Sequence, residues 1–139
     1  MQTLNNGKVT LVGAGPGDPD LFTIKGLKAL QKAEVILYDA LINPKLLDHN
    51  RTAKKIFVGK RRGFTKKTQV EINELIVEYA LKGFNVVRLK GGDPIIFGRG
   101  GEEAEFLKDH KVKYEIVPGI TSGIGSATYA GIPLTHRKY

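Results

Sequence analysis

Residues 9–20 read VTLVGAGPGDPD, a stretch in which a short apolar run leads into glycines and prolines. The first four residues have the β-branched and aliphatic character of a buried strand. Asp18 followed by Pro19 is a typical helix start, with the aspartate as N-cap and the proline at the first helical position. The stretch therefore predicts a strand, a glycine-rich turn and a helix, which is the opening unit of an α/β fold.

Apolar runs of the same kind recur at residues 35–38, 56–58, 86–89 and 114–117. Helical patterns separate them, and residues 68–82 and 101–109 carry the clearest ones. Strands that alternate with helices predict an α/β fold with a mostly parallel five-stranded sheet flanked by helices. In such a sheet, ligands bind beyond the carboxyl ends of the strands, where this chain concentrates its glycines and prolines.

The helix boundaries follow from capping residues. The helix that begins at Pro19 is predicted to turn Leu21, Ile24 and Leu27 inward. The helix over residues 68–82 begins with a capping box of Thr68 and Glu71, and Gly83 ends it.

Composition bounds the class of protein. The 139 residues suit one domain, and 41% hydrophobic with 26% charged residues is ordinary for a soluble protein. No segment approaches the roughly 18 apolar residues of a membrane span, and the start does not resemble a signal peptide, so we expect a cytoplasmic location. The chain lacks cysteine, and His49, His110 and His136 stand far apart without partners at metal-ligand spacing, so we expect no metal.

The net charge of +8 favours an anionic partner. The basic residues are scattered in short groups without an aromatic pattern, which favours a polycarboxylate small molecule over nucleic acid. An excess of positive charge that serves solubility alone is the remaining interpretation.

The turn GAGPGD invites comparison with nucleotide-binding loops. A dinucleotide fingerprint needs glycine where Asp18 stands, and Pro16 has no N–H to offer a phosphate. Asp39 nevertheless follows the second strand where a ribose-binding acid belongs, so this alternative stays open. A P-loop is excluded, because Lys54 and Arg61 occupy two of the positions that define that motif.

The stretch LKGGDPIIFGRGGEE, residues 89–103, is the most constrained part of the chain. Paired glycines allow a ligand to approach the backbone, and the turn at Asp93 aims its carboxylate in a fixed direction. A helix-capping turn with a surface pair between Arg99 and Glu102 is the structural alternative. Likewise, Thr121 and Ser122 have a simple interpretation as the cap of a final small-residue helix.

Taken in order, the segments VGAGPGDPDLFTIKG, VILYDALI, VGKRRG, VVRLKGGDPIIFGRGGEE, VPGITS and GIPLTHR resemble the tetrapyrrole methylases. The resemblance runs from Lys8 to the end of the chain. Within the family, GKRRG, FGRGGEE and PLTHR are most similar to the branch that methylates uroporphyrinogen III.

The resemblance implies transfer of methyl groups from S-adenosylmethionine to two ring carbons of uroporphyrinogen III, giving precorrin-2 by way of precorrin-1, on the route to siroheme and cobalamin. Asp39 matches the family's proposed proton acceptor and Lys60 its proposed proton donor. The residues that match positions lining the substrate cleft are Arg99, Glu102 and Arg137. The residues that match the cofactor-binding positions are Pro16, Gly91, Gly92, Asp93, Ile96, Thr121 and Ser122.

Family members continue beyond the motif LTHR with a second domain and bind the cofactor between the two. We therefore expect residues 1–139 to form the N-terminal α/β domain, inactive alone, of an enzyme that is a homodimer at full length and contacts neither membrane nor nucleic acid. The alternatives are a sister methylase, acting on another cobalamin-pathway tetrapyrrole or as a diphthine synthase, and a non-catalytic module that binds anions or nucleic acid.

Overall fold

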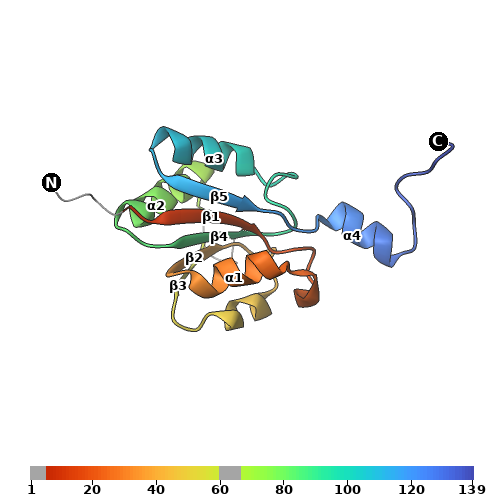
Figure 1. The fold of residues 1–139 in the computed structure, drawn as a ribbon, viewed down its shortest axis with the longest axis horizontal. Coiled ribbons are helices and arrows are strands. Elements are labelled where there is room, and N and C mark those ends of the chain that lie inside the picture. Colours follow the sequence, from red (N-terminus) through yellow and green to blue (C-terminus); the bar gives the residue numbers. More distant parts are fainter. Residues whose placement is uncertain (1–5, 60–66) are drawn as a thin grey trace.

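The computed structural model describes residues 6–59 and 67–139. Their centre is a five-stranded sheet in the order β3-β2-β4-β1-β5, as Figure 1 shows. The strands are β1 (Lys8–Gly13), β2 (Val35–Tyr38), β3 (Lys54–Phe57), β4 (Val86–Lys90) and β5 (Lys113–Val117). Every neighbouring pair is parallel, which confirms the predicted fold class. The carboxyl ends of all five strands consequently lie at one edge of the sheet.

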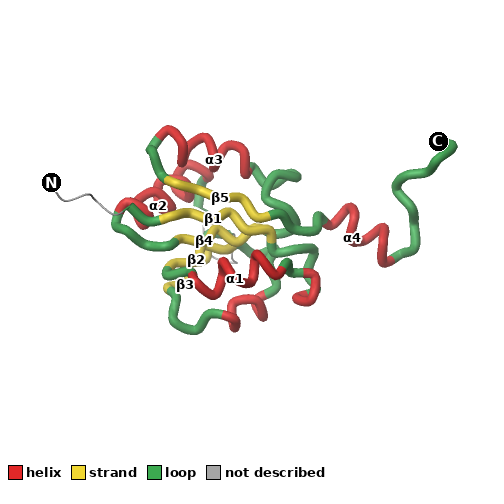
Figure 2. The backbone as a smooth tube through the Cα atoms, in the orientation of Figure 1, coloured by secondary structure: helices red, strands yellow, loops and turns green. Residues whose placement is uncertain are grey.

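Helices cover both faces of the sheet (Figure 2). On one face α2 (Gln69–Leu81) and α3 (Gly100–Asp109) close a core that includes Val9 and Leu37. On the other face α1 (Ile24–Lys32) and the 3₁₀ helix η2 (Pro44–His49) cover Val12 and Ile36. Strand residues of alternating parity thus supply the two cores, as the two-residue period of a strand requires.

The prediction of a single helix that begins at Pro19 is wrong. The chain forms a short 3₁₀ helix, η1 (Pro19–Leu21), capped by Asp18, and then extends through Phe22 before α1 begins. Thr23 provides a second N-cap, accepting a hydrogen bond from the Gly26 amide at 2.9 Å, and this restart rotates the helix so that Ile24 is 73% exposed. The chain therefore forms two short, separately capped helices in place of one continuous helix.

The predicted capping box is confirmed in α2. The Thr68 hydroxyl accepts from the Glu71 amide at 3.2 Å, and the Glu71 carboxylate accepts from the Thr68 amide at 2.8 Å. Gly83 follows the helix with φ at 94°, a left-handed conformation that glycine adopts without steric cost.

The last helix, α4 (Ser122–Tyr129), and the tail after it extend away from the sheet in Figure 1. Its contact with the domain includes the Tyr129 hydroxyl, which donates to the Asp18 carboxylate at 3.3 Å. Among the residues that the structure describes, neither α4 nor any other helix has the length and apolar character to span a membrane.

Candidate active site

Hydrogen bonds join the loops that follow β1 and β4. The Gly15 amide donates to the Gly92 carbonyl at 3.1 Å, and the Gly92 amide donates back to the Gly15 carbonyl at 2.8 Å. The Ala14 amide donates to the Lys90 carbonyl at 2.7 Å. Because these backbone donors are already occupied, the turn GAGPGD has few left for a phosphate, which weighs against the dinucleotide alternative.

Asp93 fastens the β4 loop to the loop after β5. One carboxylate oxygen accepts from the Ile95 amide at 2.9 Å, and the other accepts from the Gly119 amide at 3.0 Å. A Cβ on Gly119 would overlap the Gly92 carbonyl oxygen, and one on Gly13 would lie 2.6 Å from the Gly119 nitrogen. The paired glycines therefore serve close packing of three loops.

A pocket of about 420 Å³, the strand-end pocket, opens above these loops. One part of its lining is uncharged and includes Gly15, Pro16, Gly91, Gly92, Ile96, Thr121 and Ser122. The charged side chains that line it are Asp39, Arg88, Lys90 and Arg99, so cations outnumber the carboxylate. The pocket can therefore hold a neutral or weakly polar group beside an anionic one.

Most of the residues that the sequence motifs single out meet in this pocket: Pro16, Asp39, Gly91, Gly92, Ile96, Arg99, Thr121 and Ser122. Asp93 supports the loops from below and does not line the pocket. Glu102 and Arg137 also lie outside its lining, and Arg137 belongs to the exposed tail. Lys60, with Arg61 and Arg62, falls outside the described residues.

Arg99 lines the strand-end pocket and also forms the surface pair with Glu102. It precedes α3 in the left-handed conformation, with φ at 55°, and its guanidinium pairs with Glu102 at 2.9 Å. Both side chains are more than half exposed, so the pair contributes little to stability. Thr121 likewise stands at the N-cap position of α4 but makes no side-chain capping bond there, which leaves its hydroxyl available to the pocket.

Asp39 lies at the end of β2 with its carboxylate only partly engaged. One oxygen accepts from the Leu41 amide at 3.0 Å, and the other lies 3.6 Å from the Arg88 guanidinium. An ionised carboxylate that lines a pocket and has unused acceptor capacity can take up a proton from a bound molecule.

Sequence reasoning missed the buried charge cluster, which consists of Arg88, Lys90 and Glu103, with the half-buried amide of Gln69 beside it. The Lys90 ammonium donates to Glu103 Oε1 at 2.8 Å, and the Gln69 amide donates to the same oxygen at 3.1 Å. Arg88 Nε lies 3.5 Å from it. The side chains of Arg88 and Lys90 are 5% exposed and that of Glu103 is 1% exposed, so these charges are held under the pocket, out of bulk water.

Burial lowers the pKa of Lys90 below its ordinary value, and the nearby Arg88 charge lowers it further, while Glu103 acts in the opposite direction.

The sequence does contain a signal for the buried charge cluster. In the run VVRLK, residues 86–90, cations occupy alternate positions of an otherwise apolar central strand, which places them on one face beneath the same helices.

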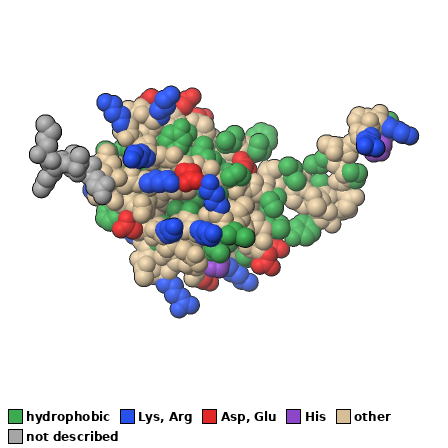
Figure 3. Space-filling model, in the orientation of Figure 1, with side chains coloured by type: hydrophobic (Ala, Val, Ile, Leu, Met, Phe, Trp, Pro, Cys, Tyr) green, Lys and Arg blue, Asp and Glu red, His purple; other side chains and the backbone are tan. Residues whose placement is uncertain are grey.

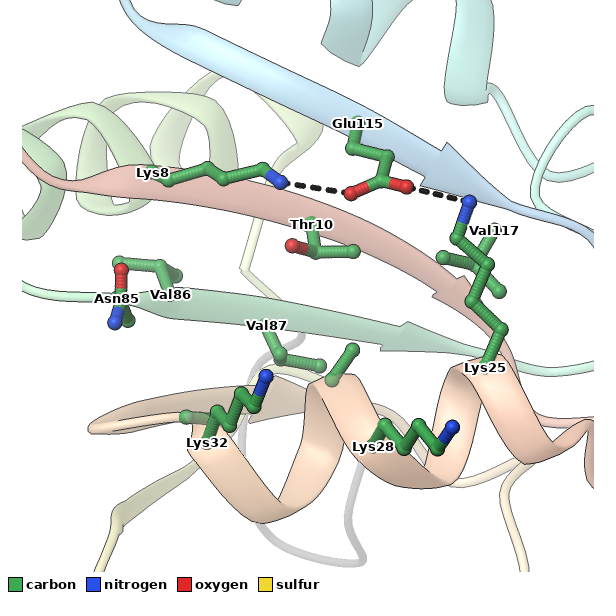
Figure 4. Close-up of a pocket in the computed structure, with 12 residues that line it drawn as sticks. Lys8, Thr10, Lys25, Lys28, Lys32, Asn85, Val86, Val87, Glu115 and Val117 are labelled. Atoms are coloured by element: carbon green, nitrogen blue, oxygen red, sulfur yellow. Dashed lines mark hydrogen bonds and ion pairs between the residues drawn. The ribbon is translucent and has the colours of Figure 1, made fainter.

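A second groove, of about 240 Å³, lies over α1, β1 and β5, and Figure 4 shows its side chains. Glu115 accepts from Lys8 at 2.7 Å and lies 2.6 Å from the Lys25 ammonium. Its hydrogen bonds to Lys25 and then Lys8 lower the pKa of Glu115 to about 2. Lysines gather over this face in the space-filling view (Figure 3), but none of the motif residues lines the groove.

The described residues contain no group of three or more histidine, aspartate or glutamate side chains arranged to hold a metal ion. His110 stacks on Phe106 and lies 2.8 Å from the Phe106 carbonyl oxygen. His136 lies in the tail, where its ring accepts from the Lys138 amide at 3.0 Å.

The chain matches a known protein family over nearly its whole length. The family model for Tetrapyrrole (Corrin/Porphyrin) Methylases matches residues 8–138. The chain belongs to the tetrapyrrole methylases. The resemblance drawn from the motifs is thereby confirmed.

One curated relative of this tetrapyrrole methylase is the uroporphyrinogen-III C-methyltransferase of Priestia megaterium, 60% identical over 96% of the chain and 56% of the relative. Among solved structures, a uroporphyrin-III-C-methyltransferase from Thermus thermophilus matches with a TM-score of 0.84 and 44% identity over 94% of the chain and 55% of that protein. Another Thermus thermophilus structure, solved with S-adenyl homocysteine, matches with a TM-score of 0.75 and 46% identity over 94% of the chain and 51% of that protein. The chain spans about half the length of these relatives.

Proposed function

We propose that this chain is the N-terminal, cofactor-binding part of an enzyme that transfers methyl groups from S-adenosylmethionine to uroporphyrinogen III. The products are precorrin-1 and then precorrin-2. The observation that carries the proposal is the strand-end pocket, whose lining combines uncharged, glycine-rich loop residues with the cations Arg88, Lys90 and Arg99. This mixed lining suits a cofactor without phosphate beside a polycarboxylate substrate.

The uncharged part of the lining is the proposed site for the cofactor, which supplies an activated methyl group when bound. The residues that would hold it are Pro16, Gly91, Gly92, Ile96, Thr121 and Ser122, and Asp93 would keep their loops in register. The absence of a Cβ at Gly91 and Gly92 leaves room for close approach, and the free Thr121 hydroxyl offers a hydrogen bond. Pro16 packs over Gly125 of α4, where a Cβ would come within 3.1 Å of the proline ring.

The chemical task left to the protein is orientation and proton removal. Methyl transfer would break the carbon–sulfur bond of the sulfonium, release S-adenosylhomocysteine and form a carbon–carbon bond to a pyrrole carbon. The ring would then carry the positive charge, and loss of a proton would restore its conjugation. Asp39 is the proposed acceptor of that proton, because its carboxylate lines the pocket beside Arg88. Lys60 remains the proposed donor, at a position outside the described residues.

A second domain that packs on α4 completes the proposal. Apolar side chains of α4 and the tail are exposed, among them Ile124, Tyr129, Ile132 and Leu134, and a patch of this kind usually marks an interaction site. The chain's coverage of about half of its relatives supports the same arrangement. Homodimer formation by the full-length protein is part of the proposal.

The test is methyl transfer by the full-length protein that contains this chain. Labelled S-adenosylmethionine and uroporphyrinogen III should yield labelled precorrin-2. Asp39→Asn should lower kcat by roughly a hundredfold, in the range of a general base, while Asp48→Asn, an exposed aspartate of η2, should leave it unchanged.

Other outcomes separate the alternatives. Label transfer to a different tetrapyrrole, or to a modified histidine, with none to uroporphyrinogen III would identify a sister methylase. Salt-dependent retention of generic DNA without any methyl transfer would identify a binding module.

A further inference from the structure

The buried charge cluster has more donors than acceptors. Glu103 Oε1 accepts from both Lys90 and Gln69, while Glu103 Oε2 and Arg88 Nε are buried without a hydrogen-bond partner among the described residues. An ammonium group carries three N–H donors, and the contact with Glu103 is the one hydrogen bond that the structure gives the Lys90 side chain within its described ranges. The cations are therefore held in place but not saturated.

The cluster is open on one side only. Gln69, Arg88 and Lys90 line the strand-end pocket, whereas Glu103 lies behind them in the first turn of α3 and does not line it. The carboxylate is favoured at that helix end by the helix dipole. A fixed anion behind two cations leaves their remaining donors available to a molecule in the pocket.

Packing alone does not account for these charges. Apolar side chains of similar volume at the same strand positions would stabilise the core about as well or better, because burial of charge is costly. The lowered pKa of Lys90 reflects that cost. The presence of two buried cations at the pocket wall is explained when an anion is bound there.

We propose that Lys90, held by Glu103 and flanked by Arg88, binds a carboxylate arm of the tetrapyrrole next to the carbon that is methylated. The inference rests on the proposed function. Each peripheral carbon of a uroporphyrinogen pyrrole bears an acetate or a propionate, so a peripheral carbon that gains a methyl group has a carboxylate within a few bonds. With that carboxylate on Lys90, the adjacent ring carbon lies toward Asp39, whose carboxylate is 3.6 Å from Arg88.

The methionine part of the cofactor carries a carboxylate too, so the experiment must distinguish the two sources. In the full-length protein, affinities are measured for uroporphyrin III, a stable oxidised form of the substrate, and for S-adenosylhomocysteine. 5′-Methylthioadenosine, which lacks the amino-acid carboxylate, serves as the reference for the second ligand. Lys90→Met is compared with Lys90→Arg, and Lys32→Met, an exposed lysine of α1, is the matched control.

Lys90→Met should weaken uroporphyrin binding by roughly tenfold to a hundredfold, the range for a charge-assisted hydrogen bond, with a matching rise in KM for uroporphyrinogen III. Lys90→Arg should recover most of the affinity, and S-adenosylhomocysteine binding should not change. A pair variant, Lys90→Met with Glu103→Gln, removes both charges together and should show the same loss while the thermal melt stays near that of the parent.

Unchanged uroporphyrin affinity in both Lys90→Met and the pair variant, with the parent protein binding normally, would overturn the inference while leaving the proposed function intact. A loss confined to S-adenosylhomocysteine, and absent for 5′-methylthioadenosine, would also overturn it, by giving the carboxylate site to the cofactor. A parent protein that binds neither ligand would overturn the proposed function and the inference with it, and the methyl-transfer assay would register that failure separately.

Discussion

At the scale of single residues, close contacts with neighbouring backbone atoms require glycine at the strand ends. Gly13, Gly92 and Gly119 come together where the loops after β1, β4 and β5 meet, and the Asp93 carboxylate bonds the Gly119 amide. A side chain at this junction has no direction in which to move, because its neighbours are backbone atoms. The position of the pocket wall depends on this packing.

Gly119→Ala should destabilise the protein by about 1–3 kcal/mol, since the new Cβ would overlap the Gly92 carbonyl and force the loops apart. Urea unfolding measures the change. Gly101→Ala is the matched control, in α3 with open space around its Cβ position, and it should stabilise by about 0.5–1 kcal/mol through helix propensity. Equal effects of the two substitutions would contradict the role given to the junction.

At the scale of the elements, caps determine where helices begin. The reciprocal bonds of Thr68 and Glu71 start α2, and the separate caps at Asp18 and Thr23 divide one apolar pattern into η1 and α1. Capping residues of this kind can be recognised in a sequence. When two of them stand close together, however, the sequence pattern alone does not predict which one begins the helix.

Thr68→Ala should lower the free energy of unfolding by about 1 kcal/mol, because the Glu71 amide loses its acceptor. Chemical denaturation provides the measurement. Glu74→Ala, at an exposed position inside α2, should change stability by less than about 0.5 kcal/mol. A Thr68 variant as stable as the parent would show that the box contributes nothing to α2.

Glu115 joins β5 to β1 and α1 through Lys8 and Lys25. Its pKa falls from 4.5 to about 2 on folding, so the folded protein takes up this proton later than the unfolded one as pH decreases. The stability from these pairs should be fully present above pH 4.5 and lost as pH falls through about 2.

Comparison of Glu115→Gln with the parent by urea unfolding, from neutral pH down to about 2, tests this expectation. The stability difference should shrink toward zero at the acid end. Glu105→Gln, an exposed glutamate of α3 outside these pairs, should show a small difference throughout. A Glu115 difference that does not vary with pH would contradict the assigned ion pairs.

At the scale of the whole molecule, the chain has a closed core and an uncovered helix. The sheet is buried between α1 and η2 on one face and α2 and α3 on the other, whereas α4 extends away from it (Figure 1). Apolar side chains of α4, such as Ile124 and Tyr129, are exposed. Under the proposed two-domain arrangement, this exposure is removed in the full-length protein.

Ile124→Ser should therefore destabilise the full-length protein by about 1–2 kcal/mol, the scale for loss of a buried aliphatic side chain. Val70→Ser, on α2, is the matched control, because Val70 is 60% exposed and Ile124 56%. Thermal unfolding should separate the two variants. Equally small effects at both positions would argue against a domain that covers α4.

The sequence alone predicted the five strands, a mostly parallel sheet flanked by helices, the capping box and the resemblance to the family. Strand periodicity, helix caps and glycine turns are local properties. They can be predicted from the sequence because each depends on residues a few positions apart. The motifs also pointed to most of the residues that line the strand-end pocket.

Only the tertiary structure decided where those residues lie. It showed that the Asp93 carboxylate bonds the Gly119 amide of a neighbouring loop, that Ile24 is exposed, and that Arg137 lies on an exposed tail. It also brought Lys90 of β4 against Glu103 of α3 beneath the pocket. These outcomes depend on contacts between segments that are distant in the sequence. Burial strongly changes the free energy of a charged side chain, and the burial of a residue is defined only once the chain has folded.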